Sequence, residues 1–335
     1  MADRTRIPGG LGRRDFLKAS TAGVTLAALG GAPAWAAGTP WADRPASKVD
    51  KLNFVVWTYG DIYTKIAAKF QADWGIPVDS TISSFNDHPT KLMTMYAGGE
   101  AIDVSQSSPF SFPNFISQDL VEPLDDMPGA KEYLADLTES AKQVAVYNGK
   151  LMGLPYFSTV WVWNYYQDML EKAKFEPFTS YDGFMEQCRK AKKDKLCEYP
   201  VAWVAGVGLE QLPGTWYQMT WNRGGVFFDK SGNHQLGDGS IARETLKWWM
   251  QTFKEDLADP ESLKAQFTTS AKAFGAGKNL YRGPNHHYGL NIVNDPKQSP
   301  IAGKVKVHGS SGDGRTLGDS HVYFLCTASR DKEWA

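Results

Sequence analysis

The sequence contains few cysteines, and their arrangement argues against the common cysteine-based sites. Its 335 residues include three, Cys188, Cys197 and Cys326, without any Cys-x-x-Cys pair or Cys/His cluster. A structural zinc site is therefore not expected. Cys188 and Cys197 flank a short basic segment, and an oxidising compartment would allow them to pair. A disulfide and two buried free thiols remain alternative predictions for this pair.

An excess of positive charge is also lacking. The sequence has 36 Lys and Arg residues against 37 Asp and Glu residues. Binding to nucleic acid requires a clustered positive face, which this balance does not favour. We therefore expect no nucleic-acid partner.

Recognisable catalytic motifs are absent as well. The sequence contains no G-x-S-x-G elbow, no P-loop and no H-E-x-x-H motif. His286 and His287 are adjacent, but neighbours on a strand point to opposite faces and cannot readily share one ion. The sequence thus predicts that the protein is not an enzyme and that it holds neither a metal nor a cofactor.

The N-terminus has the pattern of an export signal. Arg13 and Arg14 in "GRRDFLKAS" resemble the twin-arginine consensus, and the mildly apolar run that follows ends in Ala-Trp-Ala at Ala36. An anchor helix is the alternative, but this run is shorter than the ~20 residues that a bilayer needs. No Cys near the cleavage site could carry a lipid. We expect residues 1–36 to be removed after twin-arginine export, and the mature chain to be periplasmic without a lipid anchor.

After a linker at residues 37–49, strand and helix patterns alternate. "KLNFVVWTYG" is a strand pattern, and Ile62, Ile66, Phe70 and Trp74 then recur every four residues as one apolar helical stripe closed by Gly75. A second strand ("IPVDSTI"), a helix that starts near "NDHP" and a third strand ("AIDVSQSS") follow. This order predicts an α/β sheet, in which ligands bind beyond the carboxyl ends of the strands.

Six segments in this order resemble one protein family. They are "KFQADWGIPVDSTISSF", "NDHPTKLMTMYAGGEAIDVSQSS", "ISQDLVEPLDD", "YNGKLMGLPYF", "WNYYQDMLEKAKF" and "EPFTSYDGF". They are similar to extracellular solute-binding proteins of ABC importers, the group that includes maltose-binding protein. The similarity runs from about residue 50 to residue 335. Members of this family continue for several more helices, so the sequence looks like a fragment.

The resemblance implies a two-lobed periplasmic binding protein fold of type II. Each lobe is a mixed β-sheet flanked by helices, and the ligand lies in the cleft between them. Lobe 1 would comprise residues 50–156 with a return segment at 322–335, and lobe 2 residues 157–321. The chain would cross between them at Pro155–Thr159 and Asp319–Tyr323. Val160 to Tyr165 would then be a strand buried on both faces, which explains the many aromatic residues there.

The function that this resemblance implies is capture of a sugar or related polyhydroxylated solute. The protein would deliver it to the permease subunits of an ABC transporter and act as a monomer. Two alternatives remain open: an enzyme exported by the twin-arginine route, and a binder of a polyamine, iron or a phosphonate on the same fold.

Candidate ligand residues follow from the chemistry of sugars, which present hydroxyls at their edges and C–H groups on their faces. Such a site combines aromatic rings with a few short polar side chains. Asp61 could alternatively cap its own helix, and one of Trp216 and Tyr217 is expected in the core while the other stacks on the solute. The candidates are Trp57, Tyr59, Asp61, Ser107, Ser108, Phe110, Ser158, Trp216, Tyr217, Asn285, His286, Tyr288 and Asp319.

Overall fold

A computed structural model describes residues 48–335 except 209, 287 and 310–315. The export signal and nearly all of the linker lie outside the described residues. The described residues fall into two units, one with Lys48 and residues 125–136 and the other with the described residues of 49–124 and 137–335. The described part of the first unit includes the short helix α5 (Ala130–Asp136). In the described ranges, no helix combines the length and the apolar character needed to cross a bilayer.

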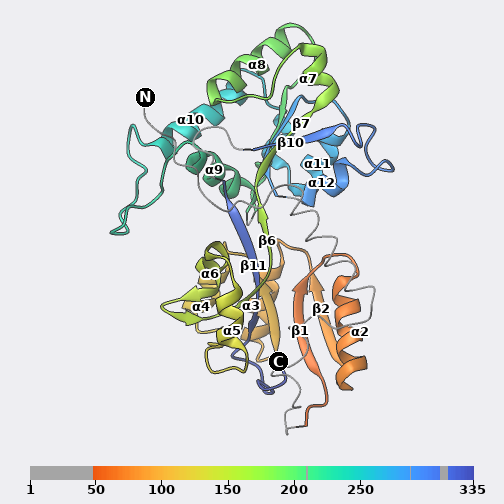
Figure 1. The fold of residues 1–335 in the computed structure, drawn as a ribbon, viewed down its shortest axis with the longest axis vertical. Coiled ribbons are helices and arrows are strands. Elements are labelled where there is room, and N and C mark those ends of the chain that lie inside the picture. Colours follow the sequence, from red (N-terminus) through yellow and green to blue (C-terminus); the bar gives the residue numbers. More distant parts are fainter. Residues whose placement is uncertain (1–47, 209, 287, 310–315) are drawn as a thin grey trace, which may run out of the picture. The chain divides into compact units, whose positions relative to one another are not determined.

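The second unit contains a five-stranded mixed sheet in the order β2-β1-β3-β11-β6 (Figure 1). β1 pairs in parallel with β2 and β3, whereas β11 runs antiparallel to β3 and β6. The strands are β1 (Leu52–Trp57), β2 (Val78–Ser83), β3 (Val104–Ser107), β6 (Leu154–Val160) and β11 (Gly318–Leu325). The accompanying helices are α2 (Ile62–Trp74), α3 (His88–Ala97), α4 (Phe112–Ser117) and α6 (Glu139–Ala145). The alternating strands and helices expected up to residue 107 are therefore confirmed.

A four-stranded mixed sheet in the order β10-β7-β9-β8 forms the other half of this unit. Its strands are β7 (Val162–Tyr166), β8 (Val201–Ala202), β9 (Tyr281–Asn285) and β10 (Val305–His308). Its helices are α7 (Gln167–Ala173), α8 (Tyr181–Lys193), α9 (Gln211–Asn222), α10 (Ile241–Lys254), α11 (Phe267–Gly275), α12 (Tyr288–Val293) and the 3₁₀ helix η2 (Pro260–Lys264). A small hairpin of β4 (Val146–Tyr147) and β5 (Lys150–Leu151) precedes β6.

Each sheet has its own hydrophobic core. Around the first, Val55, Leu92, Phe115 and Phe324 are buried together. The second core is dominated by aromatic rings, including those of Trp163, Phe178, Phe184, Trp203 and Tyr281. Two separate cores joined by a few extended segments are what the sequence length and the family resemblance implied.

The aromatic run from Tyr156 to Tyr166 passes from one sheet to the other. β6 belongs to the first sheet and ends at Val160, and β7 of the second sheet begins at Val162. Trp161 lies between them and belongs to neither strand. Trp161 and Trp163 are fully buried, as expected for core residues. The expectation that the strand is buried on both faces from Val160 onward is wrong, because Val160 ends β6 with 54% of its surface exposed.

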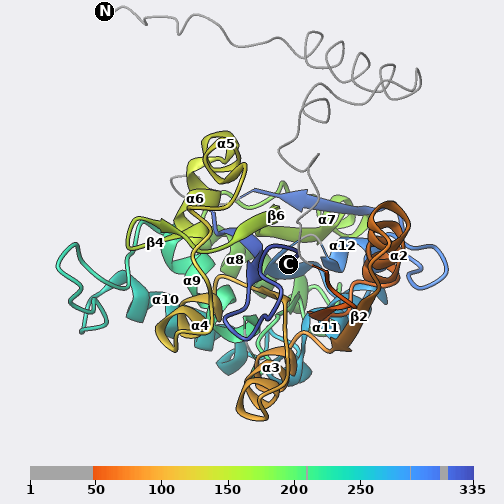
Figure 2. The ribbon, with the colours of Figure 1, turned by 90° about the horizontal axis from the view of Figure 1, so that it is seen from below.

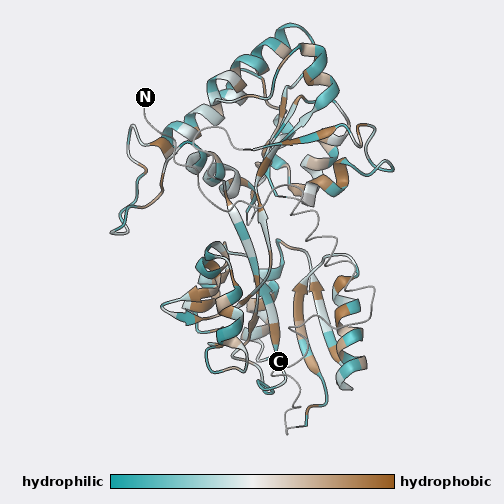
Figure 3. Cartoon of the chain, in the orientation of Figure 1, coloured by the Kyte–Doolittle hydropathy of each residue, from teal (hydrophilic) through white to brown (hydrophobic). Residues whose placement is uncertain are grey.

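The predicted apolar stripe of α2 is also corrected. Ile62 and Ile66 are 48% and 44% exposed, and the buried residue of this helix is Tyr63. α2 lies beside the edge strand β2 (Figures 1 and 2), and hydrophobic and hydrophilic residues alternate around it (Figure 3). The rotation of the helix is set by Tyr63, whose hydroxyl donates a hydrogen bond to Gln106 Oε1 at 2.6 Å. Helical periodicity alone did not indicate which side chain would be inward.

The three cysteines are free thiols in the structure. Cys188 is fully buried in the second core, and burial raises its pKa well above the ordinary value. Cys197 is partly buried and packs against the same core. Of the two alternatives for this pair, the structure has the free thiols.

Candidate functional site: an aromatic pocket and a buried carboxylate–histidine cluster

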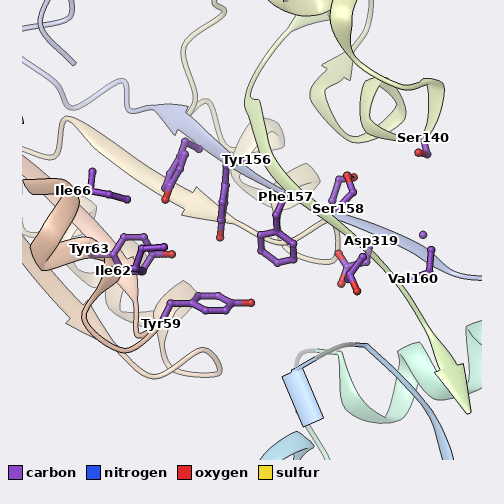
Figure 4. Close-up of a pocket in the computed structure, with 14 residues that line it drawn as sticks. Tyr59, Ile62, Tyr63, Ile66, Ser140, Tyr156, Phe157, Ser158, Val160 and Asp319 are labelled. Atoms are coloured by element: carbon purple, nitrogen blue, oxygen red, sulfur yellow. The ribbon is translucent and has the colours of Figure 1, made fainter. Parts of the chain in front are cut away.

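A cavity of about 810 Å³ opens beside the strands β6 and β11 (Figure 4). The loop after β1, the first turns of α2 and both strands contribute to its wall. Its lining residues are Tyr59, Ile62, Tyr63, Ile66, Ser140, Tyr156, Phe157, Ser158, Thr159, Val160, Gly318, Asp319, Ser320 and Tyr323. The exposed isoleucines of α2 therefore face this cavity.

Aromatic rings form one side of the pocket. Tyr59 meets Phe157 edge to face at 5.9 Å between ring centroids (Figure 4). Tyr156 stacks on Tyr323 with ring centroids 4.1 Å apart. The hydroxyl of Tyr156 also donates to Gln106 Oε1, at 3.0 Å. Burial raises the pKa of Tyr156, which keeps the phenol protonated as a donor. Contacts inside the protein thus fix the Tyr156 ring, and its flat surface contributes to the cavity wall.

Short polar side chains form the opposite side. The hydroxyls of Ser158 and Ser320, on paired strands, are 2.6 Å apart. Asp319 is the neighbour of Ser320 and reaches the cavity although only 1% of its surface is exposed. Within the described part of the chain, neither oxygen of this carboxylate has a hydrogen-bond partner. Burying a carboxylate without a hydrogen bond costs free energy. Asp319 is therefore suited to accept a hydrogen bond from a solute or to bind a cation.

Asp319 also belongs to a buried cluster with Glu210 and His321. Asp319 and His321 are two residues apart on β11 and point to the same face, and His321 Nε2 lies 3.3 Å from Asp319 Oδ1 and 3.9 Å from Glu210 Oε1. Glu210 directly precedes α9. Burial and the neighbouring Asp319 raise the pKa of Glu210, and a nearby Ser108 hydroxyl opposes this rise.

Aromatic rings surround His321. Its imidazole lies 4.5 Å from Phe157, 5.2 Å from Trp57 and 6.1 Å from Phe85, measured between ring centroids. These contacts separate the cluster from bulk water, which strengthens every charge interaction within it. Sequence reasoning found Asp319 but missed Glu210 and His321. The i, i+2 spacing on a strand could have suggested His321, whereas no local pattern marks Glu210.

Three of the sequence candidates line the pocket, namely Tyr59, Ser158 and Asp319. Asp61 does not; it is exposed, pairs with Lys65 at 2.8 Å and makes no side-chain capping bond to its helix. Trp57 is buried in the core instead of lining the pocket, with its ring edge-on to Phe85, His88 and His321. The loop after β1 therefore contributes Tyr59 and not Trp57.

Candidates at the end of β3 and in the following loop do not line the pocket. Ser107 and Ser108 are buried, and the Ser107 hydroxyl lies 2.9 Å from that of Ser111. Phe110 stacks on Tyr217 with ring centroids 6.0 Å apart and planes 2° apart. The Phe110 and Tyr217 rings therefore cover each other in this structure.

The neighbouring residues Trp216 and Tyr217, both on α9, differ in their surroundings. Trp216 packs against the core of the second sheet, and its indole N–H donates to the carbonyl oxygen of Ala242 at 2.9 Å. Trp216 is thus the member of the pair that joins the core.

The candidates at the end of β9 and just after it have different surroundings. Asn285 is buried and its Oδ1 accepts a hydrogen bond of 2.5 Å from the guanidinium of Arg282. The His286 ring packs against Phe267 at 4.3 Å and Trp161 at 5.9 Å. Tyr288 starts α12, but its side chain lies outside the described part, as does His287. The described members of this group do not line the pocket.

Two mixed sheets joined by long crossing strands, with a pocket on those strands, define the class of two-lobed α/β binding proteins. The predicted fold class is confirmed by solved structures of that class. The chain belongs to the family of bacterial extracellular solute-binding proteins, whose model matches residues 65–281. Members of this family bind solutes outside the cytoplasmic membrane for transport, which confirms the predicted class of protein.

Solved structures of similar fold share little sequence with this chain. Maltose-bound MalE3 of T. maritima is 20% identical, with a TM-score of 0.72 over 84% of this chain and 74% of the other. A solute-binding protein of Agrobacterium vitis S4 with bound D-mannitol is 21% identical, with a TM-score of 0.70 over 85% and 70%. One of Agrobacterium radiobacter K84 in complex with ribitol is 18% identical, with a TM-score of 0.73 over 84% and 73%. No curated protein matches the sequence significantly.

Proposed function

We propose that this protein captures a sugar or polyol in the pocket beside β6 and β11. The observation that carries the proposal is the pairing of aromatic surfaces with a buried, unsatisfied carboxylate across one cavity. Tyr59 and Phe157 offer flat faces to the C–H groups of a sugar. Asp319 and the Ser158–Ser320 pair offer acceptors and donors for its hydroxyls. The solutes named for the structural neighbours, maltose, D-mannitol and ribitol, are of this chemical class.

The physiological role that follows is delivery of the solute to the membrane subunits of an ABC importer. The protein would reach the periplasm by the twin-arginine route and act there as a monomer, without an enzymatic step. Replacing Arg13 and Arg14 with Lys tests the route directly. The double variant should accumulate inside the cell as an uncleaved precursor, and normal export of this variant would contradict the proposal.

A thermal-shift screen against monosaccharides, disaccharides, polyols and amino-acid derivatives tests the solute class. A ligand at a hundred times its dissociation constant adds about 2.7 kcal/mol to the free energy of unfolding, which such a screen detects readily. We expect stabilisation by a member of the sugar or polyol group. Stabilisation only by amines or by phosphonates would reject the proposed class in favour of another solute.

Calorimetry on Tyr59→Ala then tests the pocket itself. Loss of one stacking ring should weaken binding by about 1–3 kcal/mol while the melting temperature stays close to that of the parent, because Tyr59 lies at the cavity wall. Tyr147→Ala is the matched control, since Tyr147 is an exposed tyrosine in the β4–β5 hairpin and does not line the pocket. Equal affinities of the two variants would place the solute elsewhere.

A further inference from the structure

The cluster of Glu210, Asp319 and His321 combines two carboxylates and one imidazole in a buried space. The exposed fractions of the three residues are 0%, 1% and 4%. One ligand atom from each lies within 4.8 Å of the other two. Of these three side chains, only that of Asp319 lines the cavity. A sugar in the cavity therefore does not explain why Glu210 and His321 are buried beside Asp319.

The hydrogen bonds of these side chains do not account for their burial. Both carboxylate oxygens of Glu210, both of Asp319 and both ring nitrogens of His321 lack a hydrogen bond of good geometry within the described residues. Among the described residues, the Ser108 hydroxyl is the neighbour that favours a charged Glu210. The start of α9 stabilises one nearby negative charge, but it does not compensate for two. Buried carboxylates of native proteins are normally paired or coordinate a metal.

The donor set and its spacing match a small divalent cation. Carboxylate oxygens and imidazole nitrogen are ligands of Zn²⁺ and Mn²⁺. A tetrahedral ion with bonds of about 2.0–2.2 Å holds its ligand atoms about 3.3–3.6 Å apart. The separation of His321 Nε2 from Asp319 Oδ1, 3.3 Å, falls in this range, and its separation from Glu210 Oε1, 3.9 Å, slightly exceeds it. Two carboxylates also balance the charge of the ion.

We propose that Glu210, Asp319 and His321 form a binding site for one divalent transition-metal ion of the Zn²⁺ or Mn²⁺ type. Asp319 lines the cavity, which gives the ion a path of entry and leaves one coordination position toward the pocket. Water or a solute hydroxyl fills that position. The proposal stands whether or not the solute is a sugar, because it rests on the three side chains alone.

The test uses tag-free protein that has been treated with a chelator and then titrated with Zn²⁺ and, separately, with Mn²⁺. We expect one equivalent of metal per chain. Glu210→Gln and His321→Gln should each weaken metal binding at least tenfold, since the first removes the negative charge of one ligand and the second removes the imidazole nitrogen, while both keep a side chain of similar size. Asp295→Asn is the control, because Asp295 is an acidic residue whose oxygens accept bonds from Lys297 and Gln298 in its own turn.

A spectroscopic measurement keeps the proposal testable if a variant fails to fold. Electron spin-echo spectra of Mn²⁺ bound to the unaltered protein should show modulation from a coordinated imidazole nitrogen. Absence of stoichiometric metal, absence of the nitrogen signal, or equal metal affinity in the parent and the two Gln variants would each overturn the proposal. Stabilisation of the metal-free protein by putrescine, with none by either metal, would also overturn the proposal. It would show that the carboxylates bind an amine. Repeating the sugar screen on metal-free protein shows whether solute binding depends on the metal. Failure of the metal proposal can then be distinguished from failure of the solute proposal.

Discussion

Trp216 and Tyr217 are adjacent in sequence, yet they have different neighbours because successive helical residues point about 100° apart. Trp216 contacts the second core and donates a hydrogen bond to Ala242, whereas Tyr217 stacks on Phe110. The sequence could predict that only one of them would be a core residue. The choice between them depends on the rotation of α9 against its sheet.

The first prediction follows from this difference. Trp216→Ala should lower the free energy of unfolding by up to about 3 kcal/mol, because it leaves a cavity at the core and an unpaired carbonyl. Its solute affinity per folded molecule should be unchanged. Tyr217→Ala should destabilise the protein less than Trp216→Ala and leave solute affinity unchanged, because Tyr217 stacks on Phe110 and does not line the pocket. Calorimetry with apo melting curves separates the two effects, and the reverse order would mean that the core assignment is wrong.

His88 provides a prediction about pH. Its ring is buried, and Nε2 lies 2.9 Å from the carbonyl oxygen of Gln106. Burial lowers the pKa of His88 from 6.5 to about 4, so the folded protein favours the neutral ring. The unfolded chain therefore binds a proton first as the pH falls, and stability should decline from about pH 6.5 down to about pH 4 by roughly 3 kcal/mol from this residue.

The measurement is urea unfolding of the parent and of His88→Asn at pH 7, 5 and 4. The variant is expected to be less stable than the parent at pH 7, because it loses buried contacts. Its free energy of unfolding should then fall less steeply between pH 6.5 and 4. Parallel pH profiles for the two proteins would show that His88 is not the titrating group.

At the scale of elements, α9 has a glycine in its second turn where a helix would ordinarily favour alanine. A Cβ at Gly214 would lie 2.4 Å from the Cη2 atom of Trp161, the residue between β6 and β7. Trp161 is fully buried and also packs against Phe267. Gly214 therefore allows the helix to approach the segment where the chain passes from one sheet to the other.

Gly214→Ala should consequently destabilise the protein, although helix propensity favours alanine by about 1 kcal/mol. Overpacking against a fixed indole typically costs about 1–3 kcal/mol and outweighs that gain. Gly183→Ala in α8 is the control, since its Cβ would meet only the side chain of Ser180 at 3.1 Å. Thermal unfolding of the two variants decides the matter, and equal or higher stability of Gly214→Ala would show that Trp161 can move.

The two segments that connect the sheets suggest where the backbone would bend when solute binds. Residues 155–159 and 319–323, which the sequence suggested as crossings, are paired within the first sheet as parts of β6 and β11. The backbone leaves that pairing at Val160–Val162 and just before Gly318. Hinge motion absorbs its dihedral changes at the ends of such elements.

We therefore expect a solute identified in the screen to close the two lobes by rotation about these positions. Closure requires that the solute bind one arrangement more tightly than the other, which contacts from both lobes would supply. Small-angle scattering with and without saturating solute should show a smaller radius of gyration in the bound state. An identical radius of gyration at saturation would mean that binding occurs without closure.

The sequence alone was enough to predict the family, the alternation of strands and helices up to β3, and the presence of two cores. These features depend on local periodicity, on turn residues such as Gly75 and on the order of segments along the chain. The sequence also pointed to Tyr59, Ser158 and Asp319, because short polar or aromatic residues at strand ends and crossings are local signals. Those three are the candidates that line the pocket.

Contacts between side chains that are distant in the sequence could not be predicted and follow from the packing of the elements. Glu210 and Asp319 are separated by more than a hundred residues, and their approach depends on how α9 meets β11. Tyr63, and not Ile62 or Ile66, is the buried residue of α2, and its hydroxyl bonds to the distant Gln106. The burial of Trp57 likewise depends on a distant partner, His321. Periodicity specifies that a helix or strand has an inner face. The packing of distant elements determines which residues occupy that face and which unsatisfied groups are buried together.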